Sequence, residues 1–219
     1  MITRSFTQNM LRLVPEIGIS LAFNKFIDVA IAMNSDHDDP FFLRKILINF
    51  CKEQRYIFME TYTALLLEIS GDGSGLNDVL GEFMIRIIGS PVRIHDQKYY
   101  DTLPGLINCK EPATRLTDYG CNTGRRILAA AKFNRNLRFY GTDSYLPFVK
   151  ISLLNLCLNG LYGEIAYSTA INLSLISIWS ADLNYKGKAV IRELPPERSL
   201  LFQKREDSDP VKSKLIFNF

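Results

Sequence analysis

The chain has 219 residues, of which 47% are hydrophobic and 22% are charged, and its formal net charge is +3. This balance excludes an intrinsically disordered chain and supplies enough apolar material for one domain, or for one domain with a substantial extension. The slight basic excess is compatible with nucleic-acid contact but does not require it.

The cysteines and the N-terminal sequence indicate a soluble, cytoplasmic protein. The four cysteines are scattered, without Cys-x-x-Cys spacing and without histidines at ligand spacing, so we expect reduced thiols and no metal site. The N-terminal segment lacks the basic start, apolar block and cleavage site of a secretory signal. No apolar run reaches about 18 residues, the length that a membrane-spanning helix requires. We therefore expect no contact with a membrane.

The first part of the chain has apolar residues at helical spacing. Residues 1–33 predict two short helices that are separated at Pro15. Residues 41–70 predict one long amphipathic helix, or two with a break near residues 54–56. We therefore expect the chain to begin with a helical region.

Two polar segments between these helices allow more than one interpretation. Residues 34–42 contain three aspartates, a histidine and a proline, which would suit a metal site but are more typical of a capped helix start. Residues 71–75 read Gly-Asp-Gly-Ser-Gly and predict a flexible connector, because no lysine follows and no strand precedes them, as a phosphate-binding loop would require. The next helix is expected to be capped by Asn77 or Asp78.

The segment from Leu116 to Gly160 carries the strongest functional pattern. A short strand-like piece ends in Asp118-Tyr119-Gly120-Cys121-Asn122-Thr123-Gly124, and an alanine-rich helix follows. Glycines at a strand tip let the backbone approach a ligand closely, and the next helix directs its free N–H groups at the same point. A second strand-like run ends at Asp143, 23 residues after Gly120. An acidic residue at this spacing accepts hydrogen bonds from ribose hydroxyls in nucleotide-binding βαβ units.

The sequence also predicts the helix and strands that follow this unit. The helix at 144–159 is apolar nearly all round, so either the chain itself or a partner chain must cover it. Strands are expected at 164–167, 188–192 and 214–219. Five basic residues in and after the first helix would suit a phosphate path, but a solvated face is the more common use of such a cluster. They are Arg125, Arg126, Lys132, Arg135 and Arg138.

The loop, the alanine-rich helix, the Tyr-Gly-Thr-Asp that ends at Asp143 and the Asn-Gly at residues 159–160 together resemble an adenine-N6 DNA methyltransferase. The likeness is to its S-adenosylmethionine-binding half, above all in the modification subunits of type I restriction systems, and covers about residues 77–165. Those enzymes usually have Asp-Pro-x-Cys-Gly-Thr-Gly in the loop, so Tyr119 and Asn122 are departures. The resemblance implies these cofactor-binding residues: Asp118, Gly120, Cys121, Thr123, Gly124 and Asp143.

Two further segments resemble motifs of DNA methyltransferases. Residues 96–104 contain the ingredients of the Gln-Phe-Phe-Thr-Pro segment that packs against the cofactor in that family, which makes Tyr100 and Thr102 additional candidates for cofactor contact. Asp39-Pro40-Phe41 resembles a fragment of the catalytic motif of permuted DNA methyltransferases, but it lacks the second proline and the strand that should lead into it.

The catalytic tetrapeptide Asn/Asp-Pro-Pro-Tyr/Phe of adenine-N6 methyltransferases is missing. In that motif a side-chain oxygen and a proline carbonyl accept the amine hydrogens of a flipped adenine, and the aromatic ring stacks on the base. Pro195-Pro196 follows the predicted strand 188–192, where the motif would belong. However, Leu194 has no oxygen in its side chain and Glu197 cannot stack. No catalytic residue is therefore assigned.

These observations predict an α/β fold in two parts. We expect a helical region at residues 1–110 and, at 111–219, a Rossmann-like S-adenosylmethionine-dependent methyltransferase domain with a shortened, mostly parallel sheet. One implied function is that of an S-adenosylmethionine-binding adenine-N6 DNA methyltransferase or a subunit of one, with a partner chain or an unrecognised loop supplying the base pocket. The expected partners are DNA and a protein partner or a second copy of the chain. The alternative is a methyltransferase-like module without catalysis that binds DNA or a protein partner.

Overall fold

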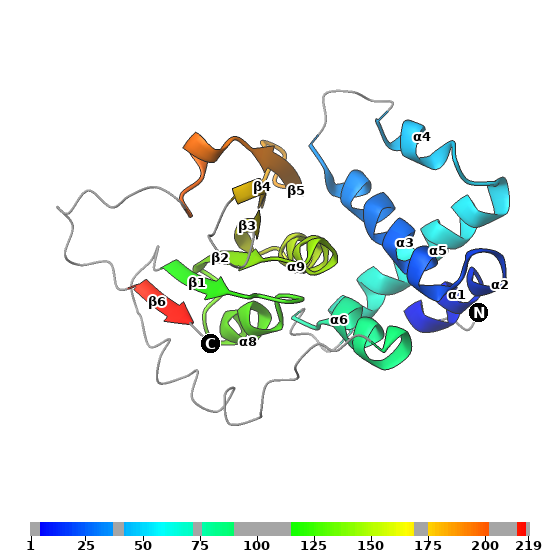
Figure 1. The fold of residues 1–219 in the computed structure, drawn as a ribbon, viewed down its shortest axis with the longest axis horizontal. Coiled ribbons are helices and arrows are strands. Elements are labelled where there is room, and N and C mark those ends of the chain that lie inside the picture. Colours follow the sequence, from blue (N-terminus) through cyan, green and yellow to red (C-terminus); the bar gives the residue numbers. More distant parts are fainter. Residues whose placement is uncertain are drawn as a thin grey trace.

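The computed structural model describes residues 5–36, 42–71, 76–89, 115–168, 175–201 and 214–217. The helices of residues 6–88 precede the sheet in the chain and pack beside it (Figure 1). The helices are α1 (Phe6–Leu11), α2 (Val14–Ile17), α3 (Ile19–Asn34), α4 (Phe42–Leu47), α5 (Lys52–Ser70), α6 (Val79–Phe83), the π-helical turn η1 (Met84–Ile88), α8 (Arg125–Phe133), α9 (Leu146–Leu158) and the 3-10 turn η2 (Pro196–Arg198). The strands are β1 (Arg115–Tyr119), β2 (Arg138–Asp143), β3 (Tyr162–Ser168), β4 (Leu175–Leu183), β5 (Ala189–Leu194) and β6 (Lys214–Phe217).

The sheet has six strands in the order β5-β4-β3-β2-β1-β6. The pairings of β1 with β2, β2 with β3 and β1 with β6 are parallel, whereas β4 and β5 form an antiparallel extension beyond β3. The consecutive β1–α8–β2–α9–β3 connections and the return of β6 to the other side of β1 give the fold a Rossmann-like α/β topology, as predicted. The strand order reverses between β1 and β6, and such a switch point is the usual location of a ligand in open α/β sheets.

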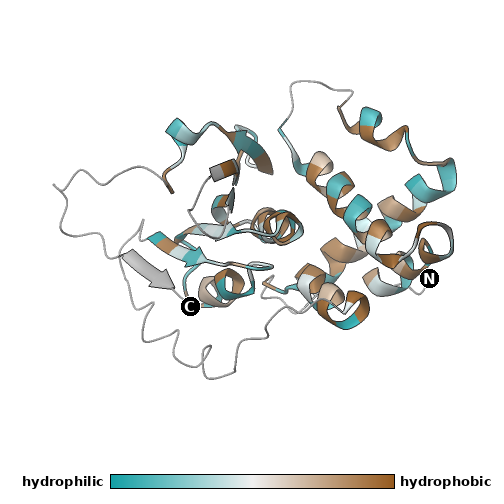
Figure 2. Ribbon diagram, in the orientation of Figure 1, coloured by the Kyte–Doolittle hydropathy of each residue, from teal (hydrophilic) through white to brown (hydrophobic). Residues whose placement is uncertain are grey.

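The apolar helix α9 is covered by the chain itself. One side packs on β2, β3 and β4, and another packs on α3, so Leu153 is almost completely buried. Figure 2 shows α9 as predominantly apolar along its length. The contact with the sheet is close at Gly163, where an added Cβ would lie 2.9 Å from a methyl carbon of Leu156. No partner chain is needed to explain the apolar character of this helix.

The helical region is held together by phenylalanine side chains. The ring centroids of Phe6 and Phe83 lie 5.3 Å apart in an edge-to-face contact, and Phe23 stacks on Phe83 at 5.0 Å. These rings belong to the same continuous cluster of buried residues as Leu116 of β1 and Ile191 of β5. The helices and the sheet therefore share one hydrophobic core.

Two predicted helix boundaries were wrong. The first segment forms α1, α2 and α3 and not two helices, because Pro15 fits the first turn of α2 and the chain breaks at Gly18, which has a φ of 74°. The predicted break within residues 41–70 lies at residues 48–51, between α4 and α5, and not at 54–56. There Cys51 caps α5: its thiol accepts the backbone N–H of Gln54, and the Gln54 side chain accepts the N–H of Cys51.

The remaining predictions for the helical region have mixed outcomes. Asp78 caps α6, since its side chain accepts the N–H of Gly81 at 2.9 Å. Within the described chain no cluster of three metal-ligating side chains occurs, and residues 37–41 lie outside that part. Residues 72–75 of the glycine run also lie outside it. None of the helices that the structure describes is long and apolar enough to span a membrane.

Candidate functional site

The loop after β1 is built from three residues with positive φ. Gly120 has a φ of 72°, Asn122 of 49° and Gly124 of 79°. Asn122 is the one non-glycine residue with a positive φ in the part of the chain that the structure describes, and asparagine tolerates this conformation better than most residues. The N–H groups of Gly120 and Cys121 both donate to the carbonyl of Thr142, at 2.8 and 2.9 Å. The loop is thereby fixed to the end of β2.

Asp143 lies at the end of β2 and contacts the same loop. Its Oδ2 accepts the N–H of Asn122 at 2.9 Å, and its Oδ1 accepts the N–H of Tyr145 at 2.8 Å. The residue is 9% exposed, and this burial raises the pKa of its carboxyl group while the backbone N–H groups act in the opposite direction. The structure thus brings together the loop and the acid whose spacing suggested a nucleotide-like ligand.

Asp118 is buried beneath the loop and forms an ion pair with Arg126. Its exposure is 0%, and the guanidinium donates from Nε to Oδ2 at 3.0 Å and lies 2.5 Å from Oδ1 through Nη2. Arg126 also donates to the carbonyl of Gly120 at 2.7 Å. Burial raises the pKa of Asp118 to about 7, with Arg126 limiting the rise. Asp118 is one of the predicted site residues, and in the structure it supports the loop through Arg126.

The elevated pKa of Asp118 predicts a pH-dependent stability. The folded chain binds this proton more tightly than the unfolded chain, whose carboxyl keeps the ordinary value of 3.8. The resulting stability is fully present below the unfolded pKa and is lost as pH rises toward 7. We expect the free energy of unfolding to fall across this window by up to about 1.4 kcal/mol per pH unit.

Urea denaturation at several pH values between about 4 and 8 measures this dependence. Asp118→Asn cannot bind the proton, so its free energy of unfolding should depend less steeply on pH than that of the wild-type chain. Above about pH 7 the variant should also be less stable than the wild-type chain, because Arg126 loses its carboxylate partner there. Equal pH slopes in the two proteins would contradict the prediction.

Cys121 and Gly124 fit the loop against neighbouring elements. A Cβ added to Gly141 of β2 would lie 3.0 Å from the Cys121 sulfur, and burial raises the pKa of this thiol well above its ordinary value. A Cβ added to Gly124 would lie 2.7 Å from Oγ of Ser152 on α9. By contrast, a Cβ on Gly120 would meet no atom of the described residues within 4 Å. A side chain is therefore not excluded by packing at Gly120 within the described chain, whereas Gly124 permits close packing of α8 on α9.

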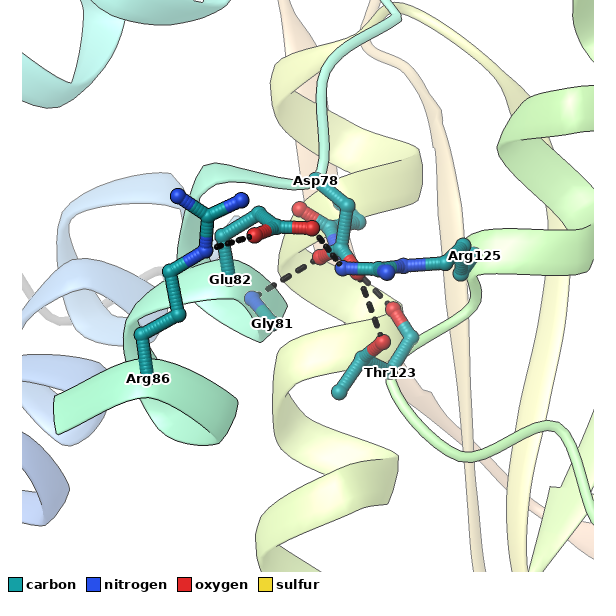
Figure 3. A network of polar contacts seen from close by, with 7 residues as sticks. Asp78, Gly81, Glu82, Arg86, Thr123 and Arg125 are labelled. Atoms are coloured by element: carbon teal, nitrogen blue, oxygen red, sulfur yellow. Dashed lines mark hydrogen bonds and ion pairs between the residues drawn. The ribbon is translucent and has the colours of Figure 1, made fainter. Parts of the chain in front are cut away.

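Asp78 joins α6 to the loop and to both sheet-packing helices, and sequence reasoning had treated it only as a helix cap. Its Oδ1 accepts the Gly81 N–H at 2.9 Å and the Asn155 side-chain amide at 2.8 Å. Its Oδ2 accepts the Thr123 hydroxyl at 2.8 Å and Nε of Arg125 at 3.0 Å. Figure 3 shows Gly81, Thr123 and Arg125 around the Asp78 carboxylate. The Thr123 hydroxyl, which was predicted to contact a cofactor, thus donates a hydrogen bond to Asp78 of the same chain.

Ion pairs extend this network to the surface. Arg125 also donates to Glu82 at 2.5 Å, and Glu82 lies 2.7 Å from Nε of Arg86 (Figure 3). Burial raises the pKa of Asp78, while Arg125 and the hydrogen-bond donors lower it. The Asn155 amide additionally donates to the carbonyl of Thr123 at 2.8 Å. The contact of Asp78 with the loop had one indication in the sequence. Asp78 lies at the helix start where the resemblance to the methyltransferase family begins.

The position of Pro195-Pro196 differs from the sequence prediction. The predicted strand 188–192 is β5, which forms one edge of the sheet, and β4, β3 and β2 separate it from β1. The strand next to β1 on the side away from β2 is β6. The interpretation that Pro195-Pro196 stands where a catalytic motif belongs was therefore wrong. The reason is that the chain turns back after β3 and forms an antiparallel hairpin, which no periodicity in the sequence indicated.

The predicted site residues thus fall into three groups. Gly120 and Asp143 lie at the carboxyl ends of β1 and β2, next to the switch point between β1 and β6 where open α/β sheets usually bind a ligand. The second group consists of residues whose side chains, or lack of one, serve contacts within the chain: Asp118, Cys121, Thr123 and Gly124. The third group, Tyr100 and Thr102, lies outside the described residues.

The fold and the loop define an α/β protein with a Rossmann-like strand–glycine loop–helix unit. No protein-family model matches the sequence, and no curated protein matches it either. A solved structure from Listeria monocytogenes, described as a candidate class I S-adenosylmethionine-dependent methyltransferase, is similar with a TM-score of 0.41 and 11% identity. The match covers 74% of this chain and 53% of that one, so the chain spans about half the length of that structure. A resemblance this distant supports no conclusion about activity.

Proposed function

We propose that this chain binds S-adenosylmethionine in the crevice next to Gly120 and Asp143. The observation that carries the proposal is the contact of the Asp143 carboxylate with the loop backbone at the ends of two adjacent parallel strands. A carboxylate at this position is suited to accept ribose hydroxyls. The open space at Gly120 leaves room for the ligand to approach the backbone.

The charges around the loop favour S-adenosylmethionine over a phosphate-bearing cofactor. Arg125 is bound by Asp78 and Glu82, and Arg126 is buried against Asp118. Both arginines at the start of α8 are therefore committed to carboxylates of this chain. S-adenosylmethionine carries a sulfonium, an ammonium and a carboxylate group but no phosphate, so its recognition does not require a pair of free guanidinium groups.

Adenine-N6 DNA methylation is the finer part of the proposal and rests on the motifs that resemble that family. The base-contacting residue would have to follow β6, since β6 and β1 flank the switch point. The sequence has Asn218 directly after β6, outside the described residues. A carboxamide oxygen is a suitable acceptor for the amine hydrogens of adenine. A protein partner or a second copy would supply further DNA contacts.

A methyltransferase-like module without catalysis is the second candidate function. It is favoured by the position of Pro195-Pro196 after β5, a strand that β4, β3 and β2 separate from β1, and by the neighbours Leu194 and Glu197. Incubation with methyl-labelled S-adenosylmethionine and mixed-sequence DNA separates the two candidates. N6-methyladenine in the digested DNA supports the enzyme, whereas cofactor binding without methyl transfer supports the module.

Calorimetric titration with S-adenosylmethionine and with S-adenosylhomocysteine tests the binding proposal. We expect saturable binding of one ligand per chain, and a dissociation constant about 100-fold higher in Asp143→Ala. Loss of hydrogen bonds to a charged group costs about 1.5–3 kcal/mol, and 1.4 kcal/mol corresponds to a factor of ten. The matched control is Asp182→Ala, since Asp182 is an exposed aspartate on β4 whose carboxylate also accepts a backbone N–H. Absence of binding at millimolar ligand to the folded wild-type chain would refute the proposal.

A further inference from the structure

Exposed basic side chains gather at the amino-terminal edge of the sheet, at the opposite end of the strands from the glycine loop. Lys132 lies in the last turn of α8, and Arg138 begins β2. Lys186 and Lys188 lie in the connection from β4 to β5, beside the start of β3, because β3 and β4 pair antiparallel. Among the residues that the structure describes at this edge, Asp182 is the one exposed carboxylate. The edge is therefore positive, although the whole chain has a formal net charge of only +3.

These cations are not neutralised by carboxylates of the described chain. Within that part, Lys132, Lys186 and Lys188 form no ion pair. Arg138 hydrogen-bonds the side chain of Tyr140 and keeps further N–H groups for another acceptor, since a guanidinium has five. The edge can therefore attract and hold phosphate groups.

Aromatic rings are exposed along the same edge. Tyr185, next to Lys186, is 90% exposed, and Phe133 at the end of α8 is 52% exposed. Tyr162 begins β3 as the register partner of Arg138 and is 36% exposed. Such rings stack on unpaired bases of any sequence, while neighbouring cations bind the phosphates. Neighbouring strands lie about 4.8 Å apart, so the edge from β2 to β5 is about 14 Å wide, the length of about four stacked nucleotides.

We propose that this amino-terminal edge binds single-stranded nucleic acid, whose phosphates contact the lysines and Arg138 and whose bases stack on Tyr185 and the neighbouring rings. A single strand fits better than a duplex, because the bases of a duplex are stacked on each other and leave no face for a ring. A lipid surface fits less well, because the exposed rings belong to a helix end, a strand and a turn and not to one amphipathic helix. The site is separate from the crevice at Gly120 and does not depend on the proposed function.

Fluorescence anisotropy of a labelled oligothymidylate of about eight nucleotides, titrated with the full chain, tests the proposal. We expect saturable binding that weakens about 20- to 50-fold between about 50 and 200 mM sodium chloride, since log K falls with a slope of about −0.7 for each of three or four phosphate contacts. A duplex of the same length and inorganic polyphosphate of matched charge should each bind about tenfold more weakly, because neither offers an unpaired base.

Two pairs of variants test the rings and the cations. Tyr185→Ala should weaken binding about tenfold or more, whereas Tyr56→Ala, which removes a 62% exposed tyrosine of α5, should not. Lys186→Ala should reduce the salt slope by about 0.7, whereas Lys52→Ala at the exposed start of α5 should leave it unchanged. Equal unfolding midpoints in urea establish that all four variants are folded. The proposal is overturned if the anisotropy does not saturate, if duplex or polyphosphate binds as tightly, or if the members of each pair behave alike.

Discussion

Replacing Asp78 by alanine is expected to lower the free energy of unfolding by about 3–5 kcal/mol, the cost of removing one partner from a buried ion pair. The carboxylate accepts four hydrogen bonds from Gly81, Thr123, Arg125 and Asn155. Without it, the Asn155 amide and the Thr123 hydroxyl lose an acceptor in a buried environment, which costs more than an exposed loss. Urea denaturation followed by Trp179 fluorescence measures the change.

Glu82→Gln serves as the matched control for Asp78→Ala. Glu82 pairs with the same guanidinium of Arg125, but its side chain is 41% exposed. A pair of this exposure contributes no more than about 1 kcal/mol, so the control should unfold near the wild-type midpoint. If both variants lose the same stability, the burial of Asp78 is not what makes its contacts important.

Alanine substitutions at Gly124 and Gly120 are expected to separate the packing role of the loop from its ligand role. Gly124→Ala should cost about 2–5 kcal/mol, because the new Cβ meets Ser152 at 2.7 Å and the φ of 79° is unfavourable for alanine. Gly120→Ala has only the φ penalty of about 1–2 kcal/mol, since its Cβ meets nothing within 4 Å. Its methyl group does, however, occupy the space that a ligand needs.

Two measurements distinguish these roles. Urea denaturation should rank Gly124→Ala well below Gly120→Ala in stability, and calorimetry should show loss of S-adenosylmethionine binding in Gly120→Ala while that protein remains folded. Gly187→Ala, in the turn after β4, is the control for backbone strain, because its φ of 75° is similar and its Cβ also meets nothing. Normal ligand binding by Gly120→Ala would argue against a ligand at this crevice.

The local pattern of the βαβ unit could be predicted from the sequence. The glycines, the apolar strands and the position of Asp143 are all set by short-range periodicity and spacing, and the structure has each of them in its expected element. A cap at Asn77 or Asp78 was also predictable, because a single side chain and the next three residues determine it, and the structure has the cap at Asp78.

The long-range arrangement could not be predicted. Strand order depends on which edges pair, and the alternation in residues 188–192 is the same for a strand beside β1 as for one at the far edge. The side-chain partners of Arg126 and Asp78 also lie in other elements. Asp118, the partner of Arg126, lies 8 residues away in the chain. Thr123, a partner of Asp78, lies 45 residues away. A charged residue on a helix is usually solvated, so nothing local indicated that Arg126 would be buried.

The continuous core has a consequence for how the molecule unfolds. Phe6 near the start of the chain and Ile191 of β5 belong to one buried cluster, and Asp36 after α3 donates its N–H to the carbonyl of Ile191. Helices and sheet should therefore lose their structure in a single cooperative transition. A ligand that binds only the folded chain then protects every element, including α1, by mass action. Thermal midpoints read from any part of the molecule should therefore report binding of S-adenosylmethionine at the proposed site.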